Sequence, residues 1–202
     1  MCFSASASFI VSGVLGILGV ISIGEVKKPR LYFLAAMPFI FSIQQAAEGF
    51  VWVYQAQIAA MIYLFFALII WPTFIPVGLF LVERKSKARN YLLFFSIAGV
   101  SLSLYYLVIM IMFTPEFSLE GCHIVYTIYP LSASVFVRSA VYGACTLLPF
   151  FISTVAYMEI IGLLGALACL VSYLFFTLYF ISVWCFFAAL ISAVIVAIVR
   201  KN

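Results

Sequence analysis

Long apolar stretches alternate with short polar ones along the chain. A helix needs ~20 apolar residues to cross the ~30 Å hydrocarbon core of a membrane, and these stretches are of that length. The pattern predicts seven spans, at about residues 5–24, 31–53, 58–82, 91–113, 139–157, 160–178 and 181–199. The last two come from dividing one apolar run that is too long for a single helix. We therefore expect one all-α transmembrane domain over residues 1–202.

The composition agrees with this class and excludes others. Of 202 residues, 68% are hydrophobic and only 8% are charged, whereas a soluble domain has about 25% charged residues. So few charges cannot cover a soluble surface, which excludes a water-soluble enzyme and a disordered chain. The basic residues sit in short loops, so we expect membrane lipids as partners and no nucleic acid.

The direction of insertion follows from the basic residues, which favour the cytoplasmic side. In a seven-span chain, the odd-numbered loops and the C-terminus lie on one side of the membrane. That side receives every basic residue except Arg138: Lys27, Lys28, Arg30, Arg84, Lys85, Lys87, Arg89, Arg200 and Lys201. The N-terminus is therefore expected outside and the C-terminus in the cytoplasm.

The loop between spans four and five, residues 114–138, is the least membrane-like part of the chain. Its β-branched and aromatic residues fit either a small hairpin lid or a short interfacial helix. Elsewhere, Ser4, Ser8, Ser12 and Gly16 recur every four residues and predict a tight helix–helix seam. Pro72, Pro76 and Pro149 are expected to kink their helices.

Glu48 is the one acidic residue inside a predicted span. A charged side chain in a bilayer costs about 2.5–3.5 kcal/mol on insertion scales, so it usually faces the interior of a bundle. Gln44, Glu48 and Trp52 follow one another at intervals of four residues and share a helix face, with Gln45 beside them. A structural ion pair between Glu48 and Arg138 is an alternative to a functional role.

Other polar residues gather in the outer half of the bundle, whereas the inner halves are almost wholly apolar. This asymmetry predicts an outward-facing pocket within the membrane, with the outer loop as its lid, that binds a small ligand, a lipid or a metal ion. The expected ligand-binding residues are Gln44, Gln45, Glu48, Trp52, Tyr105, Arg138 and Trp184. Cys122 is placed to form a disulfide with Cys2 or Cys185, because all three lie on the oxidising side.

Several motifs together resemble an uncharacterised family of bacterial membrane proteins, a domain of unknown function. They are the opening Met1-Cys2-Phe3-Ser4-Ala5, the Gln-Gln-Ala-Ala-Glu-Gly sequence at 44–49, Trp71-Pro72 with Ile75-Pro76, and the sequence at 182–189. The resemblance implies a seven-span protein of the bacterial inner membrane. It also implies that Cys2, Gln45, Glu48, Trp184 and Cys185 belong to a family pattern.

Three functions remain open at this point. The first is pocket binding, in which Cys2, Glu48, His123 and Cys185 offer donors suited to Zn or Cu. The second is a membrane-embedded enzyme acting on a lipid or amphiphile, with Cys2 or Cys185 as the nucleophile and His123 or Glu48 as the base. The third is a transporter or channel that uses Glu48.

Overall fold

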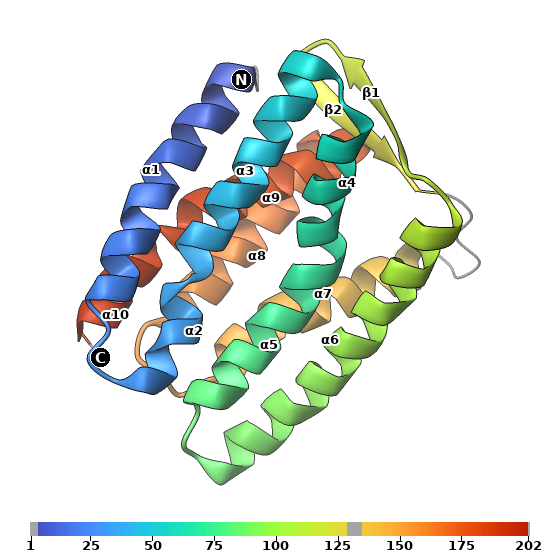
Figure 1. Cartoon of the computed structure of the whole chain (residues 1–202). Coiled ribbons are helices and arrows are strands. Elements are labelled where there is room, and N and C mark those ends of the chain that lie inside the picture. Colours follow the sequence, from blue (N-terminus) through green and yellow to red (C-terminus); the bar gives the residue numbers. More distant parts are fainter. Residues whose placement is uncertain (1–3, 129–134, 202) are drawn as a thin grey trace.

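The computed structural model of the protein describes residues 4–128 and 135–201, which form a helical bundle with a small hairpin at one end (Figure 1). The helices are α1 (Ala5–Gly24), α2 (Tyr32–Ala35), α3 (Met37–Tyr54), α4 (Gln57–Phe65), α5 (Trp71–Val82), α6 (Ser86–Met112), α7 (Val135–Ile152), α8 (Met158–Phe175), α9 (Phe180–Ser192) and α10 (Val194–Lys201). The strands are β1 (Glu116–Glu120) and β2 (His123–Thr127). The described residues are thus mostly helical, as the hydropathy pattern predicts.

Five helical segments of the described chain are long and apolar enough to cross a membrane. They are Ala5–Gly24, Gln57–Val82, Ser86–Met112, Met158–Phe175 and Thr177–Lys201. The two other predicted spans correspond to α3, which carries the polar residues around Glu48, and to the shorter apolar helix α7. Many large apolar side chains point outward, such as Ile17, Ile58, Ile111 and Leu163. Apolar exposure on this scale is typical of a membrane protein.

The seam of small residues predicted on the first span is confirmed where α1 packs on α3. Ser12 and Ser42 exchange two hydrogen bonds, each hydroxyl donating to the other residue's main-chain carbonyl oxygen, at 2.9 and 2.8 Å. A β-carbon added at Gly19 would lie 2.6 Å from the main-chain nitrogen of Phe39. Small side chains therefore let the two backbones approach closely, as helices do in lipid.

The outer loop contains an antiparallel hairpin, which decides between the two structures that the sequence allows. Glu120 pairs with His123 across a two-residue turn, Gly121–Cys122. Gly121 has a φ of +61° and Cys122 does not have a positive φ, which is the pattern of a type II′ turn. Ile124 on β2 is fully buried, so this strand packs onto the end of the bundle.

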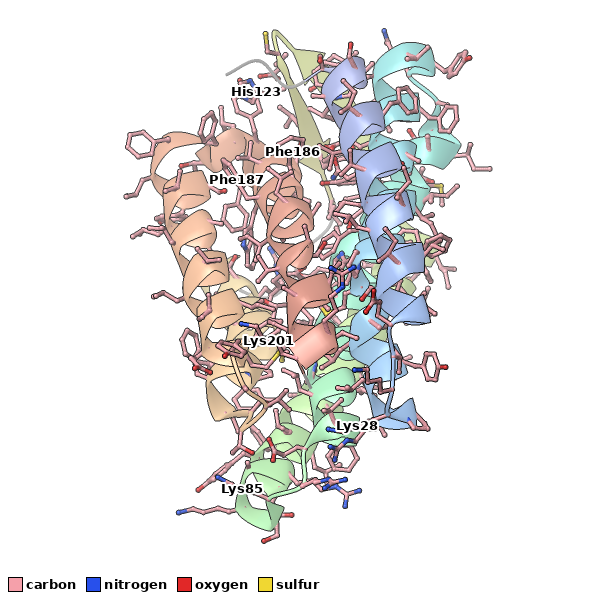
Figure 2. All side chains as sticks on the ribbon, turned by 90° about the vertical axis from the view of Figure 1, so that its left-hand side faces the viewer. Lys28, Lys85, His123, Phe186, Phe187 and Lys201 are labelled. Carbon is pink, nitrogen blue, oxygen red and sulfur yellow. The ribbon has the colours of Figure 1, made fainter. Side chains whose placement is uncertain are left out.

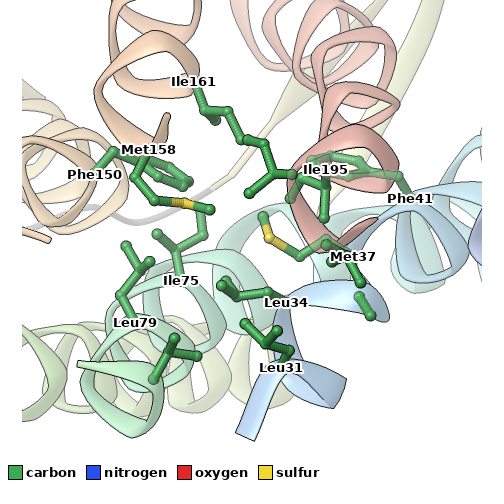
Figure 3. Packing of buried hydrophobic residues seen from close by; sticks show 14 of the residues in the cluster. Leu31, Leu34, Met37, Phe41, Ile75, Leu79, Phe150, Met158, Ile161 and Ile195 are labelled. Atoms are coloured by element: carbon green, nitrogen blue, oxygen red, sulfur yellow. The ribbon is translucent and has the colours of Figure 1, made fainter. Parts of the chain in front are cut away.

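The apolar core of the bundle lies toward the end opposite the hairpin. Figure 3 shows its centre, where Met37 and Phe41 of α3 meet Ile75 of α5, Met158 of α8 and Ile195 of α10. A second apolar cluster lies nearer the hairpin and includes Val51, Tyr63 and Ile124. Side chains from most of the helices thus meet inside the bundle.

Candidate functional site

A cavity of about 480 Å³ lies between α7, α8 and α9, close to β2. Its walls are mostly apolar, and its volume falls in the range of about 300–1,000 Å³ found for small-molecule sites. Its charged, hydroxyl-bearing and aromatic wall residues are Tyr106, Tyr126, Arg138, Ser139, Tyr142, Tyr173, Phe180 and Trp184. Leu170 and Tyr173 are themselves exposed on α8, so the cavity reaches the outer surface of the bundle.

Arg138 is the only charged residue among the described residues that line this cavity. It stands in the first turns of α7, and its side chain is only 7% exposed. Its Nη1 atom is buried and has no hydrogen-bond partner among the described residues, although the Tyr106 side chain lies near. A buried cation without a counter-charge is costly, so the site is suited to an anion.

Glu48 does not supply that counter-charge. The ion pair between Glu48 and Arg138 that the sequence allows is absent from the structure, because the Glu48 carboxylate turns toward α9. There its Oε1 atom accepts a hydrogen bond from the Ser182 hydroxyl at 2.5 Å. The ion pair found in the described residues instead joins Arg200 and Glu25, at the opposite end of the bundle.

Tyr142 forms part of the cavity wall and is held by an irregular turn. Residues 66–70, between α4 and α5, form a π-helical turn in which the Trp71 N–H bonds to the carbonyl oxygen of Phe66. The Ala67 carbonyl is then left without a main-chain donor, because its partner five residues on is Pro72, which has no N–H. The Tyr142 hydroxyl donates to that carbonyl. The proline thus creates the acceptor that positions the tyrosine.

Trp184 and Cys185, at the middle of α9, lie on the wall between two cavities. The Trp184 ring packs edge-on against Tyr142, with centroids 5.5 Å apart. Both residues also line a second, apolar cavity of about 60 Å³, together with Phe41 and Trp71. The two cavities therefore share a wall, which Tyr142, Trp184 and Cys185 help to form.

Gln44, Gln45 and Glu48 form a separate buried polar layer on α3. The Trp71 indole N–H donates to the Gln44 side-chain oxygen at 2.6 Å. Both atoms of the Gln45 amide are buried without a hydrogen-bond partner among the described residues. The prediction that this patch faces the bundle interior is confirmed, since the exposed fractions are 0% for both glutamines and 2% for Glu48.

The residues predicted to bind a ligand therefore fall into three groups. Arg138 and Trp184 line the cavity, whereas Gln44, Gln45 and Glu48 lie behind it in the polar layer. Trp52 and Tyr105 are partly buried against the apolar cluster near the hairpin. Each has a buried polar atom without a partner in the described residues.

Some cavity residues were not among the predicted ligand-binding residues. Tyr106, Tyr126 and Tyr142 place their rings on its wall. The sequence shows Tyr106 next to Tyr105 and Tyr142 one helical turn after Arg138, and this spacing is the available signal for them. Tyr126 has no such signal, because its place depends on how the hairpin folds back.

Of the four candidate metal-binding or catalytic residues, Cys2 lies outside the described residues. Glu48 and Cys185 lie near each other inside the bundle, whereas His123 lies in the hairpin. His123 stacks on Tyr179 with ring centroids 4.2 Å apart, and partial burial lowers its pKa. No group of three or more His, Cys, Asp or Glu side chains occurs in the part of the chain that the structure describes.

The structure also bears on the two disulfide pairings considered for Cys122. Cys185 is a free thiol, buried inside the bundle. The pairing of Cys185 with Cys122, one of the two that the sequence left open, is therefore not formed, because Cys122 lies in the turn of the hairpin. The other pairing, between Cys122 and Cys2, lies outside the described residues.

Fold and site together define a helical membrane protein with an internal cavity. The chain belongs to the Family of unknown function (DUF6629), which matches it over residues 1–202. None of the curated proteins and none of the solved structures matches the chain.

Proposed function

We propose that this protein binds a small amphiphile with an anionic head group inside the outer half of a bacterial inner membrane. The observation that carries the proposal is the Arg138 side chain, which is buried in the wall of a largely apolar cavity and has an unpartnered Nη1 atom. The cavity walls provide space for an apolar chain, and the guanidinium provides the charge for a carboxylate or phosphate. The proposal includes seven spans, with the N-terminus outside.

The distribution of basic residues supports this direction. Figure 2 shows Lys28, Lys85 and Lys201 in the lower part of the molecule and His123 near the hairpin at the top. Under the positive-inside rule the lower end faces the cytoplasm. Arg138 and the cavity then lie toward the outer leaflet, and the exposed wall residues Leu170 and Tyr173 of α8 make the cavity reachable for a molecule in the bilayer.

The experiment measures binding through Trp184, which lies on the cavity wall. A bromine-labelled dodecanoate is added to the protein in nanodiscs, and the quenching of tryptophan fluorescence is followed. We expect saturable quenching that the variant Trp184→Phe largely loses. Unlabelled dodecanoate and dodecyl phosphate are then tested as competitors, and dodecanol serves as the uncharged comparison.

Arg138→Gln is expected to weaken dodecanoate binding by about ten- to a hundredfold, because a hydrogen bond to a charged group is worth about 1.5–3 kcal/mol. Arg84→Gln, an exposed arginine at the other end, is the matched control and should not change binding. If dodecanol competes as well as dodecanoate in the wild type, the anionic head group is not recognised. If no compound quenches saturably, the binding proposal itself is wrong.

A membrane-embedded enzyme is the second candidate, and one observation favours it: the Cys185 thiol lies on the cavity wall. Of the four residues considered as catalytic groups, Cys185 is the one among the described lining residues, whereas His123 and Glu48 are not. A thiol needs a nearby base or cation to react at neutral pH. This role would require Cys185→Ser to abolish turnover of a bound amphiphilic ester while dodecanoate binding persists.

A further inference from the structure

A buried cluster of polar side chains joins α1, α3, α4 and α9, and none of its members lines the cavity described above. The oxygen-bearing side chains of this cluster are Ser8, Gln45, Glu48, Tyr63 and Ser182. Their exposed fractions are all 3% or less. Ser182 is hydrogen-bonded to the Glu48 carboxylate, and Ser8, Gln45 and Tyr63 lie next to it.

The polar cluster lacks a counter-charge among the described residues. Glu48 forms no ion pair with a basic residue of the described chain. Neither polar atom of the Gln45 amide has a partner within 3.5 Å there, although this side chain lies near enough to the Glu48 carboxylate to interact with it. A buried polar atom without a partner costs about 1–3 kcal/mol, and a buried carboxylate without a counter-charge costs more. A cation bound beside Glu48 would remove this cost.

The donor set indicates what that species is. The four side chains next to the carboxylate offer oxygen atoms: two serine hydroxyls, one phenol and one amide. The Cys185 thiol lies near them and adds a single sulfur atom. Hard cations prefer oxygen ligands, and soft metals prefer sulfur or imidazole. One carboxylate balances one positive charge, whereas a divalent ion would leave an uncompensated charge in a medium of low dielectric constant.

We propose that this polar cluster binds a monovalent cation of the Na⁺ type, with Glu48 as the charged ligand and Ser8, Gln45 and Ser182 as neutral oxygen ligands. Tyr63 closes the side toward the hairpin, where its ring stacks on Tyr126 at 5.0 Å. Its hydroxyl donates to the Ile181 carbonyl at 3.3 Å, which fixes the start of α9 beside Ser182. The site is thus assembled from helices that are distant in sequence.

The test uses ²²Na⁺ and the whole protein in detergent, with scintillation-proximity detection. We expect saturable binding that unlabelled Na⁺ displaces and choline does not. Glu48→Gln should abolish it, since the amide keeps the shape and removes the charge. In wild-type protein, absence of displaceable ²²Na⁺ binding would overturn the proposal and would mean that Glu48 is buried in its protonated form.

Two serines of α1 provide a matched pair of variants. Ser8→Ala removes a proposed ligand and should weaken Na⁺ binding by about tenfold, the effect of one lost interaction with a charged group. Ser12→Ala removes a hydroxyl one turn further along that bonds to Ser42, and it should leave the affinity for Na⁺ unchanged. Equal effects of the two variants would show that Ser8 acts only through helix packing. Neither measurement depends on the amphiphile, so the two proposals fail or succeed separately.

Discussion

Gly99 lies directly against the main chain of Pro72. A β-carbon added at Gly99 would stand 1.9 Å from the Pro72 carbonyl oxygen and 2.9 Å from its carbonyl carbon. That oxygen has no helical donor four residues on, because the residue there is Pro76, which lacks an N–H. The two prolines of α5 and the glycine of α6 therefore form one contact, in which the absence of a side chain lets the two backbones meet.

Gly99→Ala is expected to destabilise the protein strongly, because the clash is with backbone and cannot be relieved by a side-chain rotation. Overpacking typically costs about 1–3 kcal/mol, and this site should lie at the upper end. Thermal unfolding in detergent measures the effect. Gly13→Ala on α1 is the control, since a β-carbon there meets nothing within 4 Å. Similar thermal unfolding midpoints for Gly99→Ala and Gly13→Ala would contradict the close contact between Gly99 and Pro72.

Tyr142 and Pro72 are expected to be coupled, since the tyrosine hydroxyl replaces the donor that the proline lacks. Tyr142→Phe leaves the Ala67 carbonyl buried without its donor and should cost about 1–3 kcal/mol of unfolding free energy. In the background of Pro72→Ala, a main-chain N–H becomes available to the turn, and the cost of Tyr142→Phe should shrink. A double-mutant cycle on unfolding free energies measures this coupling. Additive effects would mean that the two residues act independently.

The sequence predicted most of the helices, because a membrane demands long apolar stretches and these are visible without any tertiary information. The predicted helix boundaries were less exact where a helix extends beyond the apolar stretch or ends before it. α6 begins at Ser86, inside the charged loop, because its first turn is helical but polar. α7 ends at Ile152, several residues before the end of the predicted span, and Tyr157 then adopts a φ of 70°.

The burial of the polar face on α3 was also predictable, because a Glu48 carboxylate that pointed into lipid would be energetically costly. What the sequence could not supply is the set of partners from other helices. Ser8 was visible only as a small residue in a seam, and Tyr63 only as one of 12 tyrosines in the chain. Their approach to Glu48 depends on which helices are neighbours, and no local pattern encodes that order.

The Glu83 carboxylate ties the end of α5 to the turn after α7, and its loss should be measurable. It accepts hydrogen bonds from the Thr154 N–H at 2.6 Å, the Thr154 hydroxyl at 2.8 Å, and the N–H groups of Arg84 and Lys85 at 2.9 and 3.0 Å. Glu83→Gln should lower stability by about 1.5–3 kcal/mol at neutral pH, as expected for hydrogen bonds to a charged group. Glu25→Gln, which breaks an exposed ion pair with Arg200, should cost less than about 1 kcal/mol.

The pH dependence of this effect has a definite sign. Burial alone would raise the pKa of Glu83, but the hydrogen bonds from Thr154, Lys85 and Arg84 outweigh it and lower the pKa below its ordinary value of 4.5. The carboxylate therefore contributes its full stabilisation above pH 4.5 and loses it as the pH falls through the lower, folded-state pKa. The difference in unfolding midpoint between wild type and Glu83→Gln should narrow over that acidic range. A difference that grows on acidification would rule out this role.

Cysteine labelling tests whether the cavity is open to molecules in the bilayer. Cys169 is partly buried on the cavity wall, whereas Cys145 is 1% exposed on α7 and does not line it. Two variants are compared in nanodiscs, each retaining one of these cysteines with serine at the other cysteine positions. We expect N-ethylmaleimide to react with Cys169 much faster than with Cys145, because the thiol must be reachable to react.

Dodecanoate should slow the reaction at Cys169 if it occupies the cavity, and Arg138→Gln should reduce that protection. Mass spectrometry of the intact protein gives both rates, and equal rates that dodecanoate does not alter would argue against an accessible cavity.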